Sequence, residues 1–409
     1  MNSISMSKSV VVAVLISVFC SSNSVCSGET LKVFILAGQS NMVGHARAHT
    51  AATLFASDKA RDKELIRLVF GKDSGLSRKT LEEQLVLGRK LDELTGGISH
   101  EKIKAMSEGP EKTALEASVK KLKDQHEANK QRVASACVVS DRVYISSIAD
   151  RNRKSGKLGV GYGGDGKKIG PEYAFGLSIA EKVDGPVLLI KTSWGGKSLH
   201  YNFRPPSAGP YELSEKEKAG DKVDEIRKNA GLNYRMMNEA VHKVLDNLKE
   251  YHPAYDAEDG HEIAGFVWFQ GFNDQFSSAF RDNYASNMVS FVKDVRAEYD
   301  VPDMPFVIGV LGTGVTAEKV AENAVSAGQR EAAATPEFKD NVAAVESYTE
   351  YSHYSNEVFK KGWPKHFHEW DTVGSDRPYH YLGSGAFFVR LGDAFADSMA
   401  ELMLKQQER

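Results

Sequence analysis

Residues 31–46 read LKVFILAGQSNMVGHA, and in this stretch an apolar strand leads directly into a polar turn. The run 33–37 has the continuous apolar character of a strand buried on both faces of a parallel sheet. Gly38 then allows a sharp turn and a close approach of the backbone to a ligand. Ser40 follows at the carboxyl end of the strand, where open α/β sheets bind their ligands. We therefore predict that Ser40 is a nucleophile. The alternative is an ordinary turn, in which Gly, Ser and Asn are common.

Further strands alternate with helices along the rest of the chain. The segments with strand character are 142–146, 187–191, 264–269, 305–310 and 341–345, and those with helix character are 173–182, 234–249, 284–299 and 383–404. This alternation favours a parallel sheet covered on both faces. We predict an α/β fold, a three-layer α/β/α sandwich with a central parallel sheet. The polar motifs that follow the strands then lie along one edge of that sheet.

The composition changes at about residues 51–132, which are rich in Lys, Glu, Asp, Leu and Ala and contain few aromatic residues. Leucines at 87, 91 and 94 follow helical spacing, as do the apolar residues at 115, 119 and 122. We therefore predict one domain over residues 28–409, with a helical insertion at about 51–132.

The first 27 residues have the organisation of a secretory signal peptide. Lys8 precedes an apolar run at 9–19, and small and polar residues continue to Ser27. The apolar run is short for a membrane span, although an uncleaved anchor is the alternative. We predict a secreted or periplasmic protein with no membrane span after cleavage. The formal net charge of −3 gives no indication of nucleic-acid binding.

Cysteine and histidine usage excludes several classes of site. Cys20 and Cys26 lie in the predicted leader, so the mature chain keeps only Cys137 and has no internal disulfide. The apolar neighbours of Cys137 predict that it is buried. His366 and His368 form a His-x-His pair near His353, but no matched third ligand accompanies them, so we predict no metal site and no cofactor.

Acyl transfer by a serine requires a base and an acid, and the region before the last helix supplies both. We predict a triad of Ser40, His380 and Asp376, in which His380 accepts the serine proton and Asp376 fixes the tautomer of His380. Asp371 is the reserve acid, and a Ser-His dyad is a third arrangement. The alternatives are that Asp376 caps the turn before Pro378 and that His380 packs structurally.

The negative charge that develops on the tetrahedral intermediate requires hydrogen-bond donors. We predict an oxyanion hole formed by the backbone N–H groups of Ser40, Gly195 and Gly196 and the side-chain amide of Asn273. The alternative for Asn273 and Asp274 is a cap on the following helix.

Gln39, Gln270 and Trp194 stand beside these motifs, and we predict that they contact the substrate. Gln270 is alternatively a core amide that bonds to the backbone. Aromatic rings suit the faces of sugars, although several of the aromatic residues near the motifs must belong to the core. These residues are Trp194, Tyr201, Phe203, Trp268, Phe272, Trp363, Trp370 and Tyr379.

The chain resembles the SGNH hydrolases, in particular the sialate O-acetylesterase/acetylxylan esterase group, carbohydrate esterase family 6. The resemblance rests on GQSNM at 38–42, SWGG at 193–196, WFQG at 268–271, GFND at 271–274 and the pair His380-Tyr381. It covers most of residues 31–401 apart from the insertion and the excursion after Tyr201. It implies a flavodoxin-like three-layer fold and an exported serine esterase that removes acetyl groups from an oligo- or polysaccharide without a cofactor.

Two departures from the family pattern bear on this reading. The family often has Glu where this chain has Phe272, and its acid usually stands three residues before the His, whereas Asp376 stands four before His380. Two other functions stay open: a carbohydrate-binding protein that has lost turnover, and a lipase or thioesterase with an apolar acyl channel.

Overall fold

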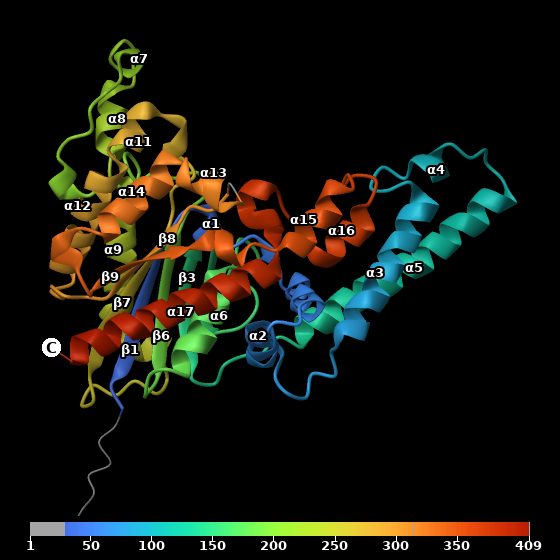
Figure 1. Cartoon of the computed structure of the whole chain (residues 1–409), viewed down its shortest axis with the longest axis horizontal. Coiled ribbons are helices and arrows are strands. Elements are labelled where there is room, and N and C mark those ends of the chain that lie inside the picture. The colour runs from blue at the N-terminus through green and yellow to red at the C-terminus, as the bar shows by residue number, and fades with distance from the viewer. Residues whose placement is uncertain (1–28, 314, 409) are drawn as a thin grey trace, which may run out of the picture.

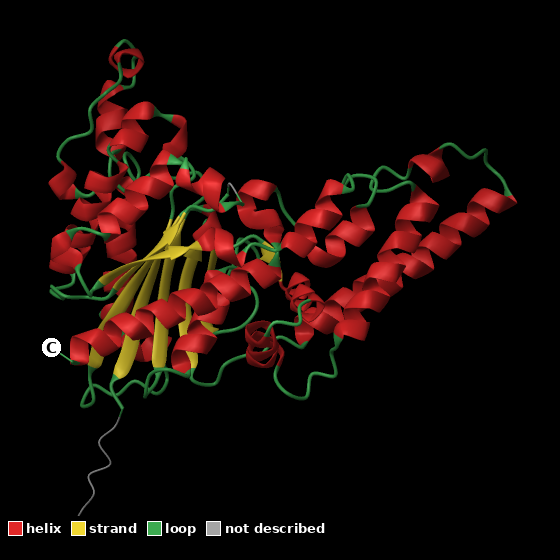
Figure 2. Cartoon of the chain, viewed as in Figure 1, coloured by secondary structure: helices red, strands yellow, loops and turns green. Residues whose placement is uncertain are grey.

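A seven-stranded sheet forms the centre of the protein, in a computed structural model that describes residues 29–313 and 315–408. The predicted signal peptide at 1–27 lies outside the described residues. The strand order is β4-β3-β6-β1-β7-β8-β9, and Figure 2 shows the sheet in yellow between layers of helices. The strands are β1 (Leu31–Gly38), β3 (Val143–Ala149), β4 (Asn152–Lys157), β6 (Val187–Ser193), β7 (His261–Phe269), β8 (Phe306–Val310) and β9 (Val342–Glu346).

The predicted three-layer α/β/α sandwich is confirmed, with one strand that the sequence did not indicate. Six strands run parallel, and β4 pairs antiparallel with β3 at the edge. The sequence of β4, NRKSGK, is polar and mostly solvent-accessible, so it carries no apolar periodicity. A second, two-stranded sheet pairs β2 (Ala46–Arg47) with β5 (Lys168–Ile169).

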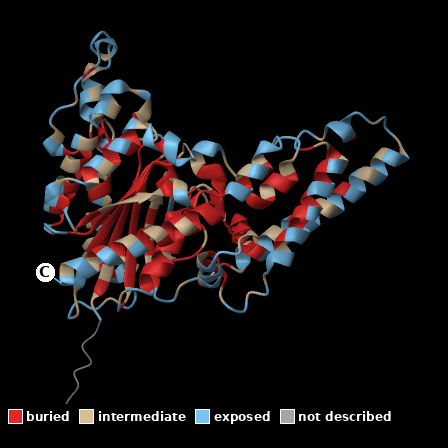
Figure 3. Cartoon of the chain, viewed as in Figure 1, coloured by how far each residue is buried: buried red, intermediate tan, exposed pale blue. Residues whose placement is uncertain are grey.

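The central strand β1 contributes to the core on both of its faces. Phe34 and Leu36 pack into the cluster on one face of the sheet, while Val33, Ile35 and Ala37 pack into the cluster on the other, and all five are 0% exposed. Figure 3 shows the strands buried between the helices. The first face is covered by α6 (Pro171–Ala180) and α17 (Gly385–Gln407), and the second by α9 (Leu232–Leu245), α12 (Tyr284–Glu298) and α14 (Ala324–Ala333).

The segment between β1 and β3, where we predict the insertion, is helical. It contains η1 (Ala48–Ala56), α2 (Ala60–Phe70), α3 (Arg78–Thr95), α4 (Glu101–Lys104) and α5 (Pro110–Ser135). Figure 1 shows α3 and α5 as a hairpin that projects away from the sheet. Near the C-terminal end of α3, the Asp92 carboxylate accepts the N–H groups of His368 and Glu369, each at 2.9 Å. These residues belong to α16 (Phe367–Val373), so the insertion contacts the segment just before Asp376.

Short helices complete the chain. They are α1 (Ser40–Val43), η2 (Pro206–Ala208), α7 (Glu215–Lys218), α8 (Val223–Asn229), α10 (Leu248–Tyr251), η3 (Asp274–Phe276), α11 (Ser278–Asp282), α13 (Ala317–Ala321), η4 (Pro336–Phe338), η5 (Ser347–Glu350), α15 (His353–Lys360) and η6 (Pro378–Gly383). None of the helices in the described part of the chain combines the length and apolarity that a membrane crossing requires. Cys137 is buried, as predicted, and burial raises the pKa of its thiol to about 12.

Candidate active site

Three of the sequence motifs meet at one edge of the sheet because their strands are parallel neighbours. Gly38, at the end of β1, pairs with Ser193 of β6 on one side and with Phe269 of β7 on the other. The carboxyl ends of these strands therefore place Ser40 between the 193–196 segment and the 270–274 segment. This edge is the usual ligand-binding edge of an open α/β sheet.

The turn that carries Ser40 depends on glycine. Gly38 has φ 153°, and a Cβ at this position would lie 2.1 Å from the carbonyl oxygen of Phe269. Gly44, just after α1, has φ 87°, and its Cβ would lie 2.3 Å from the Cα of Gly170. The chain thus makes a one-turn helix that begins at Ser40. Ser40 is 8% exposed, and its hydroxyl has no hydrogen-bond partner among the described residues, His380 included.

Gln39 links the Ser40 turn to the loop after β7. Its Oε1 accepts hydrogen bonds from Gln270 Nε2 at 3.2 Å and from the N–H groups of Gly271 at 3.1 Å and Asn273 at 3.3 Å. Its Nε2 donates to Asn273 Oδ1 at 3.0 Å. Because the Asn273 oxygen is engaged, the Asn273 amide is oriented and its Nδ2 is left as a free donor among the described residues.

Asp274 links the loop after β7 to the segment after Gly196. Its carboxylate accepts Gln270 Nε2 at 2.5 Å and the N–H groups of Leu199 at 2.9 Å and His200 at 3.0 Å. Burial raises the pKa of Asp274 to about 6, although these hydrogen bonds oppose the rise. Gln39 and Gln270 are 1% and 2% exposed and face protein groups, so their contacts are those of positioning residues rather than the substrate contacts we expected.

Three of the four expected oxyanion-hole donors are unengaged. The N–H of Gly195 donates to Asp150 Oδ1 at 2.5 Å, which makes it unavailable to a ligand. In the described part of the chain, the N–H groups of Ser40 and Gly196 and the Nδ2 of Asn273 have no acceptor. The sequence did not reveal the role of Asp150, because it follows β3 and reaches Gly195 only through the pairing of β3 with β6.

The aromatic residues near the motifs divide into core and surface. Trp194 is 8% exposed, and its ring packs 6.0 Å from that of Phe203 in the core. This packing does not support the contact between Trp194 and the substrate that we expected. Phe203, Trp268 and Trp370 are also buried, whereas Tyr379 is exposed and Phe272 is partly exposed.

Asp376 and His380 are hydrogen-bonded despite their spacing of four residues. His380 Nδ1 lies 3.0 Å from Asp376 Oδ1, which also accepts the N–H of Arg377 at 2.7 Å. The chain reverses here because Asp376 N–H donates to the carbonyl of Leu382 and Leu382 N–H donates to that of Arg377. Tyr381 and Leu382 have φ of 48° and 64°, so the reversal uses left-handed backbone, which is strained for non-glycine residues.

The charge state of this pair determines which nitrogen of His380 is free. Burial acts to raise the pKa of Asp376, but the hydrogen bonds from His380 and the Arg377 N–H hold it below its usual value. An ionised carboxylate only accepts hydrogen bonds, so the proton of a neutral His380 lies on Nδ1. Its Nε2 then has a free lone pair and can accept a proton.

Asp371, the reserve acid, is engaged elsewhere. Its Oδ2 lies 2.5 Å from Lys130 Nζ, and its carbonyl oxygen lies 2.6 Å from His49 Nε2. Lys130 belongs to α5, so Asp371 connects α16 to the helical insertion. The structure does not bring Asp371 into a hydrogen bond with His380.

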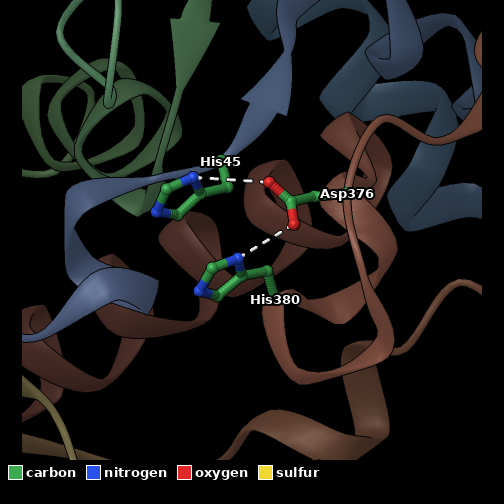
Figure 4. Close-up of side chains that lie close together, drawn as sticks. All are labelled: His45, Asp376 and His380. Carbon is green, nitrogen blue, oxygen red and sulfur yellow. Dashed lines mark hydrogen bonds and ion pairs between the residues drawn. The ribbon is translucent and has the colours of Figure 1, made fainter. Parts of the chain in front are cut away.

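Sequence reasoning missed His45, which lies beside His380 and Asp376 (Figure 4). The two imidazole rings are stacked, with centroids 4.0 Å apart and planes 2° apart, and His45 Nδ1 lies 3.5 Å from Asp376 Oδ2. Burial, together with the nearby His380, lowers the pKa of His45 to about 4, so His45 is neutral at neutral pH. The one indication of a role for His45 in the sequence was its position five residues after Ser40. Its partners Asp376 and His380 are distant in the sequence.

His45, Asp376 and His380 form the one group of three potential metal ligands in the part of the chain described. An imidazole binds a metal through a lone pair in the plane of its ring. The planes of His45 and His380 are parallel and stacked, so these lone pairs do not converge on one point. The arrangement therefore suits two imidazoles that share one carboxylate better than it suits a metal ion.

Two contacts hold the segment that carries Ser40 against the His380 segment. Asn41 Nδ2 donates to the carbonyl of Tyr379 at 3.2 Å, and His45 stacks on His380. These contacts bring a free serine hydroxyl, an Asp-supported imidazole and free N–H donors to one sheet edge. Such a set of groups can carry out acyl transfer.

A family model described as "Carbohydrate esterase, sialic acid-specific acetylesterase" matches residues 148–358, a little over half of the chain. The chain belongs to this family. The expected carbohydrate acetylesterase activity is thereby confirmed at the level of the family. The matched residues of the esterase include Gly196, Gln270 and Asn273, whereas Ser40, Asp376 and His380 lie outside them.

No curated protein is significantly similar to the esterase in sequence. Among solved structures, a protein from Arabidopsis thaliana is similar, with 14% identity, a TM-score of 0.37 and coverage of 77% of this chain and 85% of that one. A carbohydrate acetylesterase from Xanthomonas citri has 11% identity, a TM-score of 0.35 and coverage of 77% and 49%. NanS has 11% identity, a TM-score of 0.36 and coverage of 78% of both chains.

His45→Ala should lower the kcat of the esterase about 10- to 100-fold with little change in KM, because His380 loses the ring that fixes its plane. His45→Phe keeps a ring over His380 and loses only the nitrogen that faces Asp376, so most of kcat should be retained. Steady-state kinetics on a small acetyl ester measure both effects. A wild-type kcat in His45→Ala would contradict a positioning role for His45.

Proposed function

We propose that the protein is an exported serine esterase that removes O-acetyl groups from an oligo- or polysaccharide through an acyl-enzyme. Ser40 is the nucleophile, His380 the general base and acid, and Asp376 the acid that orients His380. The observation that supports this most strongly is the 3.0 Å hydrogen bond between His380 Nδ1 and Asp376. The segment that carries this pair is joined to the Ser40 turn by the hydrogen bond from Asn41 to the Tyr379 carbonyl.

The reaction begins when His380 Nε2 takes the proton from Ser40 Oγ as this oxygen attacks the acetyl carbonyl carbon. The tetrahedral intermediate collapses, the bond from carbon to the sugar oxygen breaks, and His380 gives its proton to that oxygen. Water then attacks the acetyl-Ser40 ester, with His380 accepting its proton. Acetate leaves, and Ser40 recovers its proton.

The donors that stabilise the oxyanion are the N–H groups of Ser40 and Gly196 and the Nδ2 of Asn273. Removal of one such donor typically costs about 3–4 kcal/mol of transition-state stabilisation. Gln39 supports this role because it engages Asn273 Oδ1 and leaves Nδ2 without an acceptor among the described residues. Gly195 is left out of the hole, since its N–H is engaged by Asp150.

The two alternatives predict different behaviour. A carbohydrate-binding protein without turnover would not need an imidazole supported by a carboxylate or a free serine hydroxyl. A lipase or thioesterase would prefer long acyl chains over acetyl. Membership of an acetylesterase family supports acetyl hydrolysis over both.

Ser40→Ala should abolish acetate release from acetylated glycans while the protein stays folded, because the methyl side chain of alanine has no oxygen to attack the ester. Acetate release from a panel of acetylated glycans, together with circular dichroism, provides the test. Near-wild-type turnover in the variant would remove Ser40 from the mechanism.

Asp376→Asn should lower kcat by up to about 10⁴-fold, because the amide favours the wrong tautomer of His380. Asp371→Asn is the matched control, since Asp371 faces Lys130 instead of His380. It should have a much smaller effect on kcat, although it weakens a contact of the insertion. Both variants are compared in kcat on one acetyl ester, and a larger loss in Asp371→Asn would reverse the assignment of the acid.

Export is the part of the proposal that rests on residues 1–27. Cleavage after the small-residue segment would produce a mature chain that starts near residue 28. N-terminal sequencing of the protein recovered outside the cytoplasm tests this. A chain that still begins at Met1 there would point to an uncleaved anchor.

A further inference from the structure

Three aromatic side chains form an exposed group beside the site, and we call Phe272, Phe276 and Tyr379 the aromatic cluster. Phe276 is 69% exposed and Tyr379 is 45% exposed, while Phe272 is partly buried. The Phe272 ring lies 5.2 Å from that of Phe276 and 5.8 Å from that of Tyr379, between centroids. Phe276 is the most exposed large hydrophobic side chain in the described residues.

The aromatic cluster is held by the same contacts that hold the site. Phe272 stands between Gly271 and Asn273, whose N–H groups both donate to Gln39 Oε1. The backbone of Tyr379 is held by the hydrogen bond from Asn41 to its carbonyl oxygen. The backbone that carries two of the three rings is therefore fixed relative to Ser40 before any ligand arrives.

The place of the aromatic cluster indicates which part of an ester would cover it. The ring of Tyr379 lies 4.5 Å from that of His380, and Phe272 adjoins Asn273. In the proposed reaction His380 returns its proton to the oxygen of the leaving alcohol, so the alcohol lies on the His380 side. An acetyl group ends in one methyl, so the bulk of the substrate outside the site is the sugar.

We propose that the aromatic cluster binds the apolar face of the sugar ring that carries, or adjoins, the acetyl ester. This inference rests on the proposed function and specifies which side chains bind the sugar part of the substrate. A pyranose presents C–H groups on its faces and hydroxyls at its edges. Aromatic faces accept the C–H groups, and the Tyr379 hydroxyl can bond to an edge hydroxyl. Covering the rings also removes apolar surface from water.

Phe276→Ala tests the inference, because this exposed ring is not required for packing of the core. We compare kcat/KM for an O-acetylated methyl pyranoside with kcat/KM for ethyl acetate, which has no sugar ring. The ratio of the two should fall about tenfold in the variant, mainly through KM for the pyranoside. Phe276→Trp keeps an aromatic face and should retain most of the wild-type ratio.

Tyr354→Ala is the matched control. Tyr354 is 38% exposed and lies on α15, where its neighbours include Arg89 and Glu82 of α3. Its removal should leave the ratio at the wild-type value. A fall in the ratio as large as that of Phe276→Ala would show that loss of an exposed ring outside the aromatic cluster has the same effect, and would overturn the inference.

Other outcomes separate this inference from the proposed function. A wild-type ratio in Phe276→Ala, with normal hydrolysis of the pyranoside, would overturn the inference alone. A larger loss on ethyl hexanoate than on ethyl acetate would place the acyl chain on the rings and would also overturn it. Failure of the wild-type protein to release acetate from any acetylated sugar, with ethyl acetate still hydrolysed, would instead overturn the proposed function.

Discussion

A buried ion pair between Lys191 and Glu172 holds the turn that carries Ser40. Both side chains are 0% exposed, and Lys191 Nζ lies 2.7 Å from Glu172 Oε2. The ammonium also donates to the carbonyls of Val43 and Tyr162, each at 2.9 Å. Burial lowers the pKa of Lys191, and the Glu172 carboxylate opposes that effect. The end of α1 is thereby tied to the loop that carries Tyr162 and to the start of α6. Loss of one partner of such a pair typically costs about 3–5 kcal/mol, because the other charge stays buried.

The rest of the catalytic edge is assembled by polar contacts between loops, and the helical insertion supports it from one side. Gln39 and Asp274 join the segments that follow β1, β6 and β7. Gly88 of α3 approaches α16 so closely that a Cβ would lie 2.6 Å from the carbonyl of His368. Since α16 directly precedes the Asp376 loop, the insertion contributes to holding Asp376 in place even though it projects from the sheet. Buried amides and carboxylates suit this role because each orients several backbone groups at once.

Local sequence patterns indicated the main strands of the sheet and the place of Ser40 at the end of the first one. The continuous apolar run 33–37 predicted β1, because a strand covered on both faces needs no polar alternation. The strand β4 was not predicted, because it is a polar, exposed edge strand and therefore has no apolar pattern. The parallel arrangement then predicted that Ser40 and Asn273 would share one edge. The pairing of Asp376 with His380 was predicted despite a spacing of four residues, which departs from the usual three.

Only the tertiary structure decided which of these groups are free and which are engaged. Gly195 was indistinguishable from Gly196 in sequence, but Asp150 engages its N–H across the β3–β6 pairing. Gln39 turned inward to orient Asn273, and His45 stacked on His380 from a position far away in the chain. The physical reason is that periodicity and composition report a residue's own neighbours along the chain. A hydrogen-bond partner or a stacked ring is set by how distant segments pack, and the sequence alone does not specify that geometry.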